Sequence, residues 1–245
     1  RYARGVELTP AGQSMLSYTR RLFETISQME QELSDYSGGI KGRIRLHATT
    51  SALAQFLPSD IESFTAQYPG IKLDIDERVG AAIVRAISDG RADLGIFASI
   101  TPAPDLETFH YRSDELAVAV PLNHSLADRE AVRFSEVLDY DLVASHAESA
   151  LYALITEKAK KLDKLPKVRI RVSSFDCLCQ LVAGRMGVAL LPRHVINIYA
   201  RSIPIACITL DEEWAERQLQ IGMRDFNLLP ATAKAFVEHL RTLDE

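Results

Sequence analysis

The central part of the sequence alternates between strand-like and helix-like patterns, and this alternation restricts the possible folds more than any other feature. Apolar residues at every second position over 44–48 indicate a strand with one buried face, and a helical pattern follows over 53–64. A second alternating strand over 71–75, a short helix over 79–87 and an apolar run over 93–97 complete the unit. Strands that alternate with helices pair in parallel, so the pattern predicts an α/β fold.

A second set of the same kind follows a proline-rich loop at 101–105. Strands are predicted at 115–120, 141–144, 168–172, 188–191, 207–210 and 218–223, and helices at 149–162, 175–184 and 230–243. Two sets predict two Rossmann-like α/β lobes. The strands near 116–121 and 217–223 are the candidates that cross between these lobes.

The stretch from Thr9 to Ser37 is predicted to form one long helix. Thr9 suits the N-cap and Pro10 the first helical position. Residues at alternating spacings of four and three then form a narrow seam with two positions per heptad. The seam consists of Met15, Thr19, Leu22, Ile26, Met29, Leu33 and Tyr36. A seam this narrow favours self-association as a coiled coil, and the alternative is an amphipathic helix that lies on its own domain.

Composition excludes several classes of protein. The chain has 245 residues, 47% of them hydrophobic and 25% charged, as in ordinary globular domains. A formal net charge of −5 argues against indiscriminate nucleic-acid binding, which needs a basic surface. Three cysteines, an odd number, favour a reducing compartment. No apolar run approaches the ~18 residues of a membrane span, and no signal-peptide core appears at the start, so we expect a cytoplasmic protein with no membrane partner.

Short hydroxyl side chains follow several of the predicted strands. Ligands of open α/β sheets bind at the carboxyl ends of strands, where helix N-termini attract small anions. The candidate effector contacts are Thr49, Thr50, Ser51, Phe97, Ala98, Ser99, Ser145 and Ser174, with His146 and Phe175 as side walls. The alternative for each Ser or Thr is that it only caps its own helix.

No pattern indicates catalysis, a metal site or a cofactor. The six histidines are scattered without metal-ligand spacing, and there is no glycine-rich phosphate loop or nucleophile elbow. Asp74 and Asp76 alternate along a strand as a solvated face. Cys177 and Cys179 point to different sides of a helix, and Cys207 lies in an apolar strand, so buried, inert cysteine is the better interpretation. We therefore expect no enzymatic activity.

Four segments together resemble the LysR-type transcriptional regulators. They are RYARGVELTPAG at 1–12, FTAQYPGI at 64–71, DGRADLGI at 89–96 and GRMGVALLP at 184–192. Each segment alone is weakly specific, but their order and spacing are similar to those of the family. The resemblance covers essentially the whole chain.

The resemblance implies a domain organisation. Residues 1–8 would end the wing of a winged helix-turn-helix that mostly precedes the chain, with Arg1 and Arg4 as DNA contacts. Residues 9–38 would be the linker and dimerisation helix. A periplasmic-binding-protein-like effector domain would follow, with lobe I at 42–116 and 221–245 and lobe II at 117–220. The effector domains of a homodimer or homotetramer would pair antiparallel, the helix near 53–67 of one meeting the helix near 175–184 of the next.

These features lead to one functional hypothesis. The chain is expected to be a DNA-binding transcriptional regulator whose cleft between the lobes binds a small anion or carboxylate and couples it to oligomer geometry. A solute-binding protein would share the bilobal fold, but it would need an export signal and would have no use for the helical seam. A small α/β enzyme would need clustered acid, base or nucleophilic residues.

Overall fold

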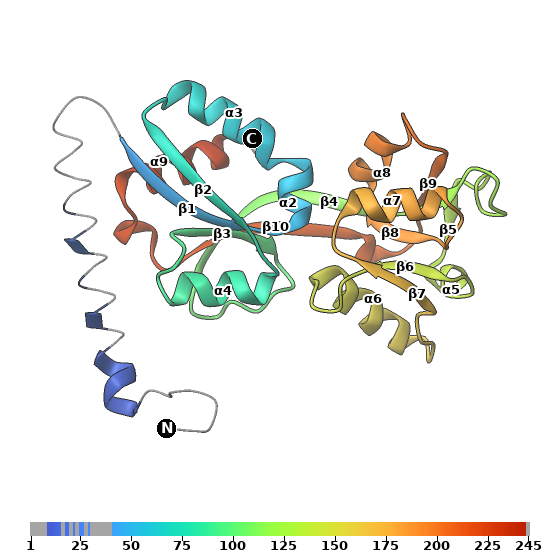
Figure 1. The fold of residues 1–245 in the computed structure, drawn as a ribbon, viewed down its shortest axis with the longest axis horizontal. Coiled ribbons are helices and arrows are strands. Elements are labelled where there is room, and N and C mark those ends of the chain that lie inside the picture. The colour runs from blue at the N-terminus through green and yellow to red at the C-terminus, as the bar shows by residue number, and fades with distance from the viewer. Residues whose placement is uncertain are drawn as a thin grey trace.

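The computed structural model describes residues 9–15, 18–19, 22, 25–26, 29 and 41–243. Within the long described range the chain forms two α/β lobes that lie side by side and are joined by two strands (Figure 1). The predicted α/β fold with two lobes is confirmed. None of the described helices is long and apolar enough to span a bilayer.

The first lobe is built on a five-stranded part of the sheet, in the order β2–β1–β3–β10–β4. β1 (Gly42–Ala48) lies between β2 (Ile71–Glu77) and β3 (Leu94–Ala98), and both pairings are parallel, as the β-α-β pattern predicts. β10 (Glu216–Met223) runs antiparallel to β3 and also to β4 (Glu107–Pro121). The sheet of the first lobe is therefore completed by β10, which is distant in sequence, and by the first part of β4.

Helices cover both faces of this sheet. α2 (Thr50–Gln55), α3 (Leu57–Gln67) and α9 (Ala231–Thr242) lie on one face, and α4 (Gly80–Ser88) lies on the other (Figure 1). The single helix predicted over 53–64 is in fact two helices. The break comes at residue 56, because the proline at the second position of α3 has no N–H to continue a helical ladder from α2.

The second lobe uses the far half of β4. There β4 pairs antiparallel with β8 (Ala189–Pro192) and with β9 (Ile205–Leu210), and β5 (Ala131–Val132) adds to the edge of β9. β6 (Leu142–Ser145) and β7 (Val168–Val172) form a separate parallel pair. The apolar side chains of this lobe form a core of their own, distinct from the two clusters in the first lobe.

The helices of the second lobe include two short ones that the sequence patterns did not predict. α6 (Ala150–Lys161) and α7 (Phe175–Ala183) agree with the prediction, and α5 (Phe134–Val137) is a single turn. α8 (Arg193–Tyr199) follows β8 directly, and its seven residues are too few to show a helical period. Short 3-10 turns, η1 (Glu213–Ala215) and η2 (Phe226–Leu228), flank β10.

The boundary between the lobes can be compared with the predicted one. The predicted division at 116/117 and 220/221 stays a prediction. In the structure β10 already pairs with the first-lobe part of β4 from Glu216 onward. The first lobe's sheet therefore extends a few residues further along β10 than the predicted boundary.

The N-terminal segment is helical at its described residues from 10 to 29. The N–H of Gly12 donates to Thr9 Oγ1 at 3.1 Å, which confirms Thr9 as the N-cap. Described apolar residues of the seam are between 47% and 72% exposed, so they do not pack on the lobes. They are Met15, Leu22, Ile26 and Met29. Thr19 is helical too, while Arg1, Arg4, Leu33 and Tyr36 lie outside the described residues, and self-association stays a prediction.

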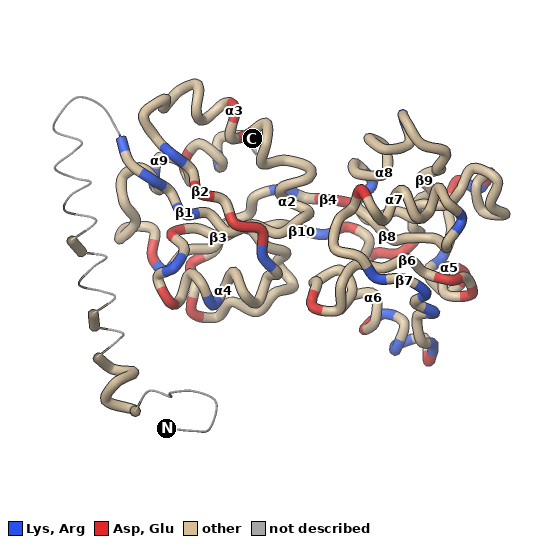
Figure 2. The backbone as a smooth tube through the Cα atoms, in the orientation of Figure 1, with Lys and Arg blue, Asp and Glu red and all other residues tan. Residues whose placement is uncertain are grey.

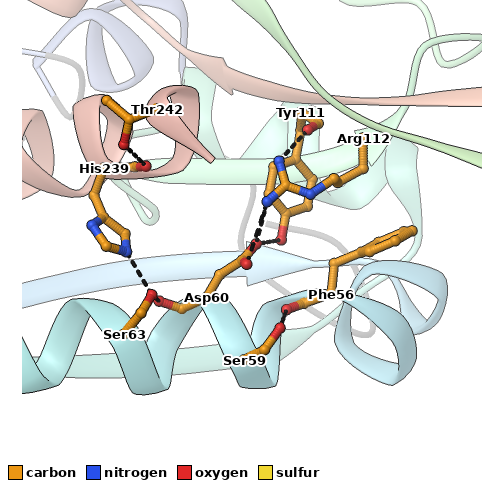
Figure 3. Close-up of polar contacts among 8 residues, drawn as sticks. All are labelled: Phe56, Ser59, Asp60, Ser63, Tyr111, Arg112, His239 and Thr242. Carbon is orange, nitrogen blue, oxygen red and sulfur yellow. Dashed lines mark hydrogen bonds and ion pairs between the residues drawn. The ribbon is translucent and has the colours of Figure 1, made fainter. Parts of the chain in front are cut away.

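A buried polar cluster fastens α3 to β4 (Figure 3). The Tyr111 hydroxyl donates to Asp60 Oδ2 at 2.6 Å, and Arg112 Nη2 lies 3.4 Å from the same carboxylate. Burial and the neighbouring carboxylate raise the pKa of Tyr111, so its hydroxyl stays protonated and remains the donor. On the other side of α3, Ser63 Oγ lies 2.7 Å from His239 Nε2 of α9 (Figure 3). These contacts hold β4 in place just before it leaves the first lobe.

Replacing Tyr111 with Phe is expected to lower the free energy of unfolding by about 1–3 kcal/mol, because the buried Asp60 carboxylate loses its short hydrogen bond. The matched control is Tyr68→Phe, whose hydroxyl has no hydrogen bond within the described part of the chain. Urea unfolding would measure both variants. Equal effects of the two substitutions would contradict a stabilising role for the Tyr111 hydroxyl.

Candidate binding cleft between the two lobes

Two antiparallel strands run through the junction of the lobes. β4 pairs with β10 over residues 107–115 and with β8 and β9 over residues 116–121, so a single strand belongs to both lobes. The start of β10 lies beside the middle of β4, with Glu216 opposite Glu115. Any ligand between the lobes would therefore meet these two strands.

A cavity of about 650 Å³ opens at this junction. Residues of both lobes and of the two crossing strands surround it. They are Ala98, Ser99, Ile100, Ser113, Asp114, Glu115, Ala150, Leu154, Lys158, Glu213, Trp214, Glu216, Arg217 and Gln218. The volume lies within the range of about 300–1,000 Å³ that is usual for small-molecule sites.

A buried ion pair joins the crossing strands beside this cavity. Arg217 on β10 donates through Nε to Asp114 Oδ1 at 2.9 Å and through Nη2 to Oδ2. The Asp114 side chain is 1% exposed and that of Arg217 is 8% exposed. Gln55 of α2 donates a third hydrogen bond to this carboxylate, at 3.1 Å. The Asp114 carboxylate is therefore fully occupied by protein groups.

A second ion pair holds the neighbouring residue of β4 to the second lobe. Arg193, the first residue of α8, donates through Nε and Nη2 to the two carboxylate oxygens of Glu115, both at 2.7 Å. These hydrogen bonds hold the pKa of Glu115 below its usual range, although burial opposes them. Arg193 also donates to Thr209 Oγ1 at 3.1 Å, which connects the pair to β9. Adjacent carboxylates of β4 thus face arginines from two different elements.

One face of α6 forms the wall of the cavity on the second lobe. Ala150, Leu154 and Lys158 recur every four residues and so lie on one side of the helix. The Lys158 ammonium lies 5.6 Å from the centre of the Trp214 ring, a cation–π contact, and forms no ion pair within the described part of the chain. The Trp214 indole N–H donates to Glu212 Oε2 at 3.0 Å. Lys158 is therefore a cation that a ligand could reach.

Two of the ten predicted effector contacts, Ala98 and Ser99, line this cavity. The other eight do not. Phe97 is fully buried on the opposite face of β3, under α4, because successive side chains of a strand point to opposite faces. Its ring lies so close to Gly222 that a Cβ at that position would come within 2.6 Å. Phe97 is thus a core residue that does not line this cavity, and its contact with a ligand stays a prediction.

The hydroxyl residues at the strand ends differ in their burial and in the partners of their side-chain hydrogen bonds. Ser174 caps α7, since its Oγ accepts from the N–H of Cys177 at 3.2 Å, as the capping alternative supposes. Thr50 donates to Glu77. Thr49 is the N-cap of α2, but its buried Oγ1 has no hydrogen-bond partner among the described residues. Ser51 and Ser145 are buried.

The remaining predicted positions flank the junction. Phe175 is buried in the core of the second lobe, and His146 is half-buried in the loop before α6. Ligand contact by any of the strand-end residues stays a prediction.

The cavity residues that sequence reasoning missed come from the crossing strands and from the middle of a helix. Asp114 and Arg217 are 103 positions apart, so no local pattern connects them. Lys158 belongs to a helix with several lysines, which resembles a solvated face. One available signal was Trp214, the only tryptophan of the chain, which precedes a predicted strand.

The surroundings of the cysteines and of Asp74 and Asp76 agree in most cases with the prediction of inert cysteines and a solvated acidic face. Burial raises the pKa of the Cys179 thiol to about 12 and also raises that of Cys207, so neither is a ready thiolate. Cys177 is half-buried. Asp74 and Asp76 are half-exposed and pair with arginines. Among the described residues there is no group of three or more potential metal ligands.

Comparison with known proteins identifies a family model, the LysR substrate binding domain, that matches residues 37–244. The chain is 22% identical to the HTH-type transcriptional activator CmpR of Synechocystis sp., over 99% of this chain and 79% of that protein. The effector binding domain of QuiR in complex with shikimate has a similar structure, with a TM-score of 0.74, 20% identity and coverage of 83% and 97%. The CcmR regulatory domain of Synechocystis PCC6803 in complex with 2-PG is also similar, with a TM-score of 0.76 and 21% identity, over 84% of this chain and 98% of that chain.

Replacing Arg217 with Met is expected to cost about 3–5 kcal/mol of unfolding free energy, because the Asp114 carboxylate would be left buried without its partner. The double variant with Asp114→Leu should recover part of this loss, since no buried charge remains. Arg201→Met, at an exposed arginine, is the matched control. Urea unfolding would measure all three. If the single and double variants lost the same stability, the buried charge would not be the cause.

Proposed function

The chain belongs to the LysR family of transcriptional regulators, and from this premise we propose that the cavity between its lobes binds a small carboxylate as an effector. The observation that carries the proposal is the composition of the cavity wall. Both lobes and both crossing strands contribute to it, and Lys158 presents a cation without an ion pair within the described residues. A ligand there would contact both lobes at once.

The charges around the cavity favour an anionic group near α6. The carboxylates of Asp114 and Glu115 are already held by arginines, and Glu213 and Glu216 are exposed, so water and salt screen them. Residue 150 begins α6 and lines the cavity, so the positive end of the helix dipole faces one part of the cavity and Lys158, about two turns further along, faces another. Shikimate, the ligand of the QuiR domain, is a carboxylate, and we extend that ligand class to this chain.

Other parts of the cavity would supply specificity. The Trp214 ring offers an apolar wall, and Ser99, Ser113 and Gln218 offer hydrogen-bonding groups. This mixture suits a carboxylate attached to a small ring or chain that carries hydroxyl groups.

The ligand would act through the relative position of the lobes. Each lobe has a separate core, and a ligand that binds one arrangement more tightly shifts the population towards it by that difference in affinity. We propose that this shift reaches DNA through the N-terminal helix and a winged helix-turn-helix, in a cytoplasmic homodimer or homotetramer. The relatives are transcriptional regulators, so a solute-binding role is not favoured.

Thermal-shift measurements with a panel of small carboxylates that includes shikimate are expected to find a ligand that stabilises the chain. A ligand present at a concentration about a hundred times its dissociation constant raises the free energy of unfolding by roughly 2.7 kcal/mol. Lys158→Met should reduce this stabilisation strongly, because the ligand carboxylate loses its cation. Lys160→Met is the matched control, since Lys160 is exposed on the same helix. A ligand whose effect is unchanged in Lys158→Met would contradict the role given to this residue.

Replacing Leu22 with Glu is expected to weaken self-association, because a charge would enter the exposed seam of the N-terminal helix. Gln13→Glu adds the same charge outside the seam and is the control. Light scattering over a range of concentrations would compare the variants with the full chain and with a chain lacking residues 1–38. A full chain that is strictly monomeric would contradict the proposed linker helix.

A further inference from the structure

A second cavity, of about 340 Å³, lies in the second lobe and shares no lining residue with the cavity between the lobes. Five side chains that can donate hydrogen bonds line it, and one acidic residue, Asp141, lines it too. The donors are Asn123, His124, Tyr140, Arg169 and Arg185. Pro121 and Val188 contribute apolar surface. The cavity lies within the size range of small-molecule sites.

Arg185 has a backbone conformation that favours glycine. Its φ is 61°, in the left-handed region, directly after the C-terminal residues of α7. The N–H of Arg185 donates to the carbonyl of Val182, and that of Met186 donates to Leu181, the pattern that often ends a helix with glycine. A side chain at such a position costs about 1 kcal/mol. Arg185 forms no ion pair within the described part of the chain, so no ion pair offsets the free-energy cost of its backbone conformation.

The backbone around Arg185 is held firmly against β6. The N–H of Val188 donates to the carbonyl of Asp141 at 2.9 Å, and the N–H of Val143 donates to the carbonyl of Val188 at 2.9 Å. Gly187 permits this approach, because a Cβ there would lie 2.4 Å from the Asp141 carbonyl oxygen. The backbone is thus fixed against β6 three residues after Arg185.

Arg169 adds a second guanidinium whose donors are largely unused. Its Nη1 lies 3.7 Å from Asp141 Oδ2, which is too long for a hydrogen bond, and both side chains are about half exposed. The stretch from Lys158 to Arg171 contains seven lysines and arginines and one aspartate in a chain of net charge −5, and Arg169 is its residue that lines this cavity. Figure 2 shows these basic residues at the end of α6 and along β7.

His124 supplies a neutral donor on the same wall. Its Nδ1 accepts from the N–H of Leu126 at 3.3 Å, so a neutral ring carries its proton on Nε2. Burial lowers the pKa of His124, which keeps the ring neutral near pH 7. The ring packs edge-on against Tyr140, with centroids 4.6 Å apart, and this contact holds it in place.

We propose that this cavity is a second ligand site, which binds a small oxyanion, either phosphate or carboxylate, between Arg169 and Arg185. Two guanidinium groups match the planar edge of an oxyanion, and the Nε2–H of His124 and the Asn123 amide complete the donors. The site is independent of the effector proposed for the cavity between the lobes. It explains why an arginine occupies a position that suits glycine.

The experiment titrates the full chain with inorganic phosphate and, separately, with acetate, at constant ionic strength set by sodium chloride. Isothermal titration calorimetry gives affinities, and thermal unfolding gives stabilities. Arg185→Gly removes the guanidinium and relieves the left-handed backbone, so the variant should unfold at a higher temperature without ligand. It should bind the preferred oxyanion at least tenfold more weakly. Arg169→Gln should also weaken binding, and Arg201→Gln, at an exposed arginine outside both cavities, should not.

Several outcomes would overturn the proposal. Absence of saturable binding by both anions would do so, and so would an unchanged affinity in Arg185→Gly. If Lys158→Met abolished phosphate binding while Arg185→Gly preserved it, the anion would be binding in the cavity between the lobes. That result would remove the second site and leave the proposed effector function intact. The stronger of the phosphate and acetate responses would identify the class of oxyanion.

Discussion

The buried ion pair between Asp114 and Arg217 is the contact on which the two-lobed arrangement depends. It joins β4 to β10 at the junction where these two strands connect the lobes, and its two side chains are almost completely excluded from solvent. A buried carboxylate is tolerated only when its partners are complete, and here Arg217 and Gln55 complete it. Adjacent to it, Glu115 is held by Arg193 of the second lobe. Consecutive residues of one strand are thus anchored to different lobes.

This arrangement has a mechanical consequence. The two lobes have separate apolar cores, so a change in their relative position need not disturb the packing within either. The strands that connect them are fixed near the junction, by the Tyr111–Asp60 hydrogen bond on one side and by Arg193 on the other. Movement would therefore be confined to a few residues of β4 and β10. The cavity beside those residues is well placed to sense it.

Two cavities of different character are lined in part by neighbouring elements of the second lobe, the larger by α6 and the smaller by β7. The larger one is lined by both lobes and mixes acidic and basic groups, of which Asp114, Glu115 and Arg217 are already in ion pairs. The smaller one belongs to the second lobe alone and is dominated by donors, with Arg185 held in a left-handed conformation. A chain with a net negative charge thus concentrates positive charge in one stretch of the second lobe. Local concentration of charge says more about ligand chemistry than the net charge does.

The sequence by itself determined the features that depend on near neighbours. The alternation of strands and helices, the cap at Thr9 and the capping alternative for Ser174 all follow from local hydrogen bonds and side-chain periodicity. The cavity between the lobes was decided only by the tertiary structure. Asp114 and Arg217 meet across 103 positions, and Lys158 faces the cavity because α6 packs in one orientation. Of the predicted hydroxyl residues at strand ends only Ser99 lines this cavity, because most of the groups that line it come from chain segments that only folding brings together.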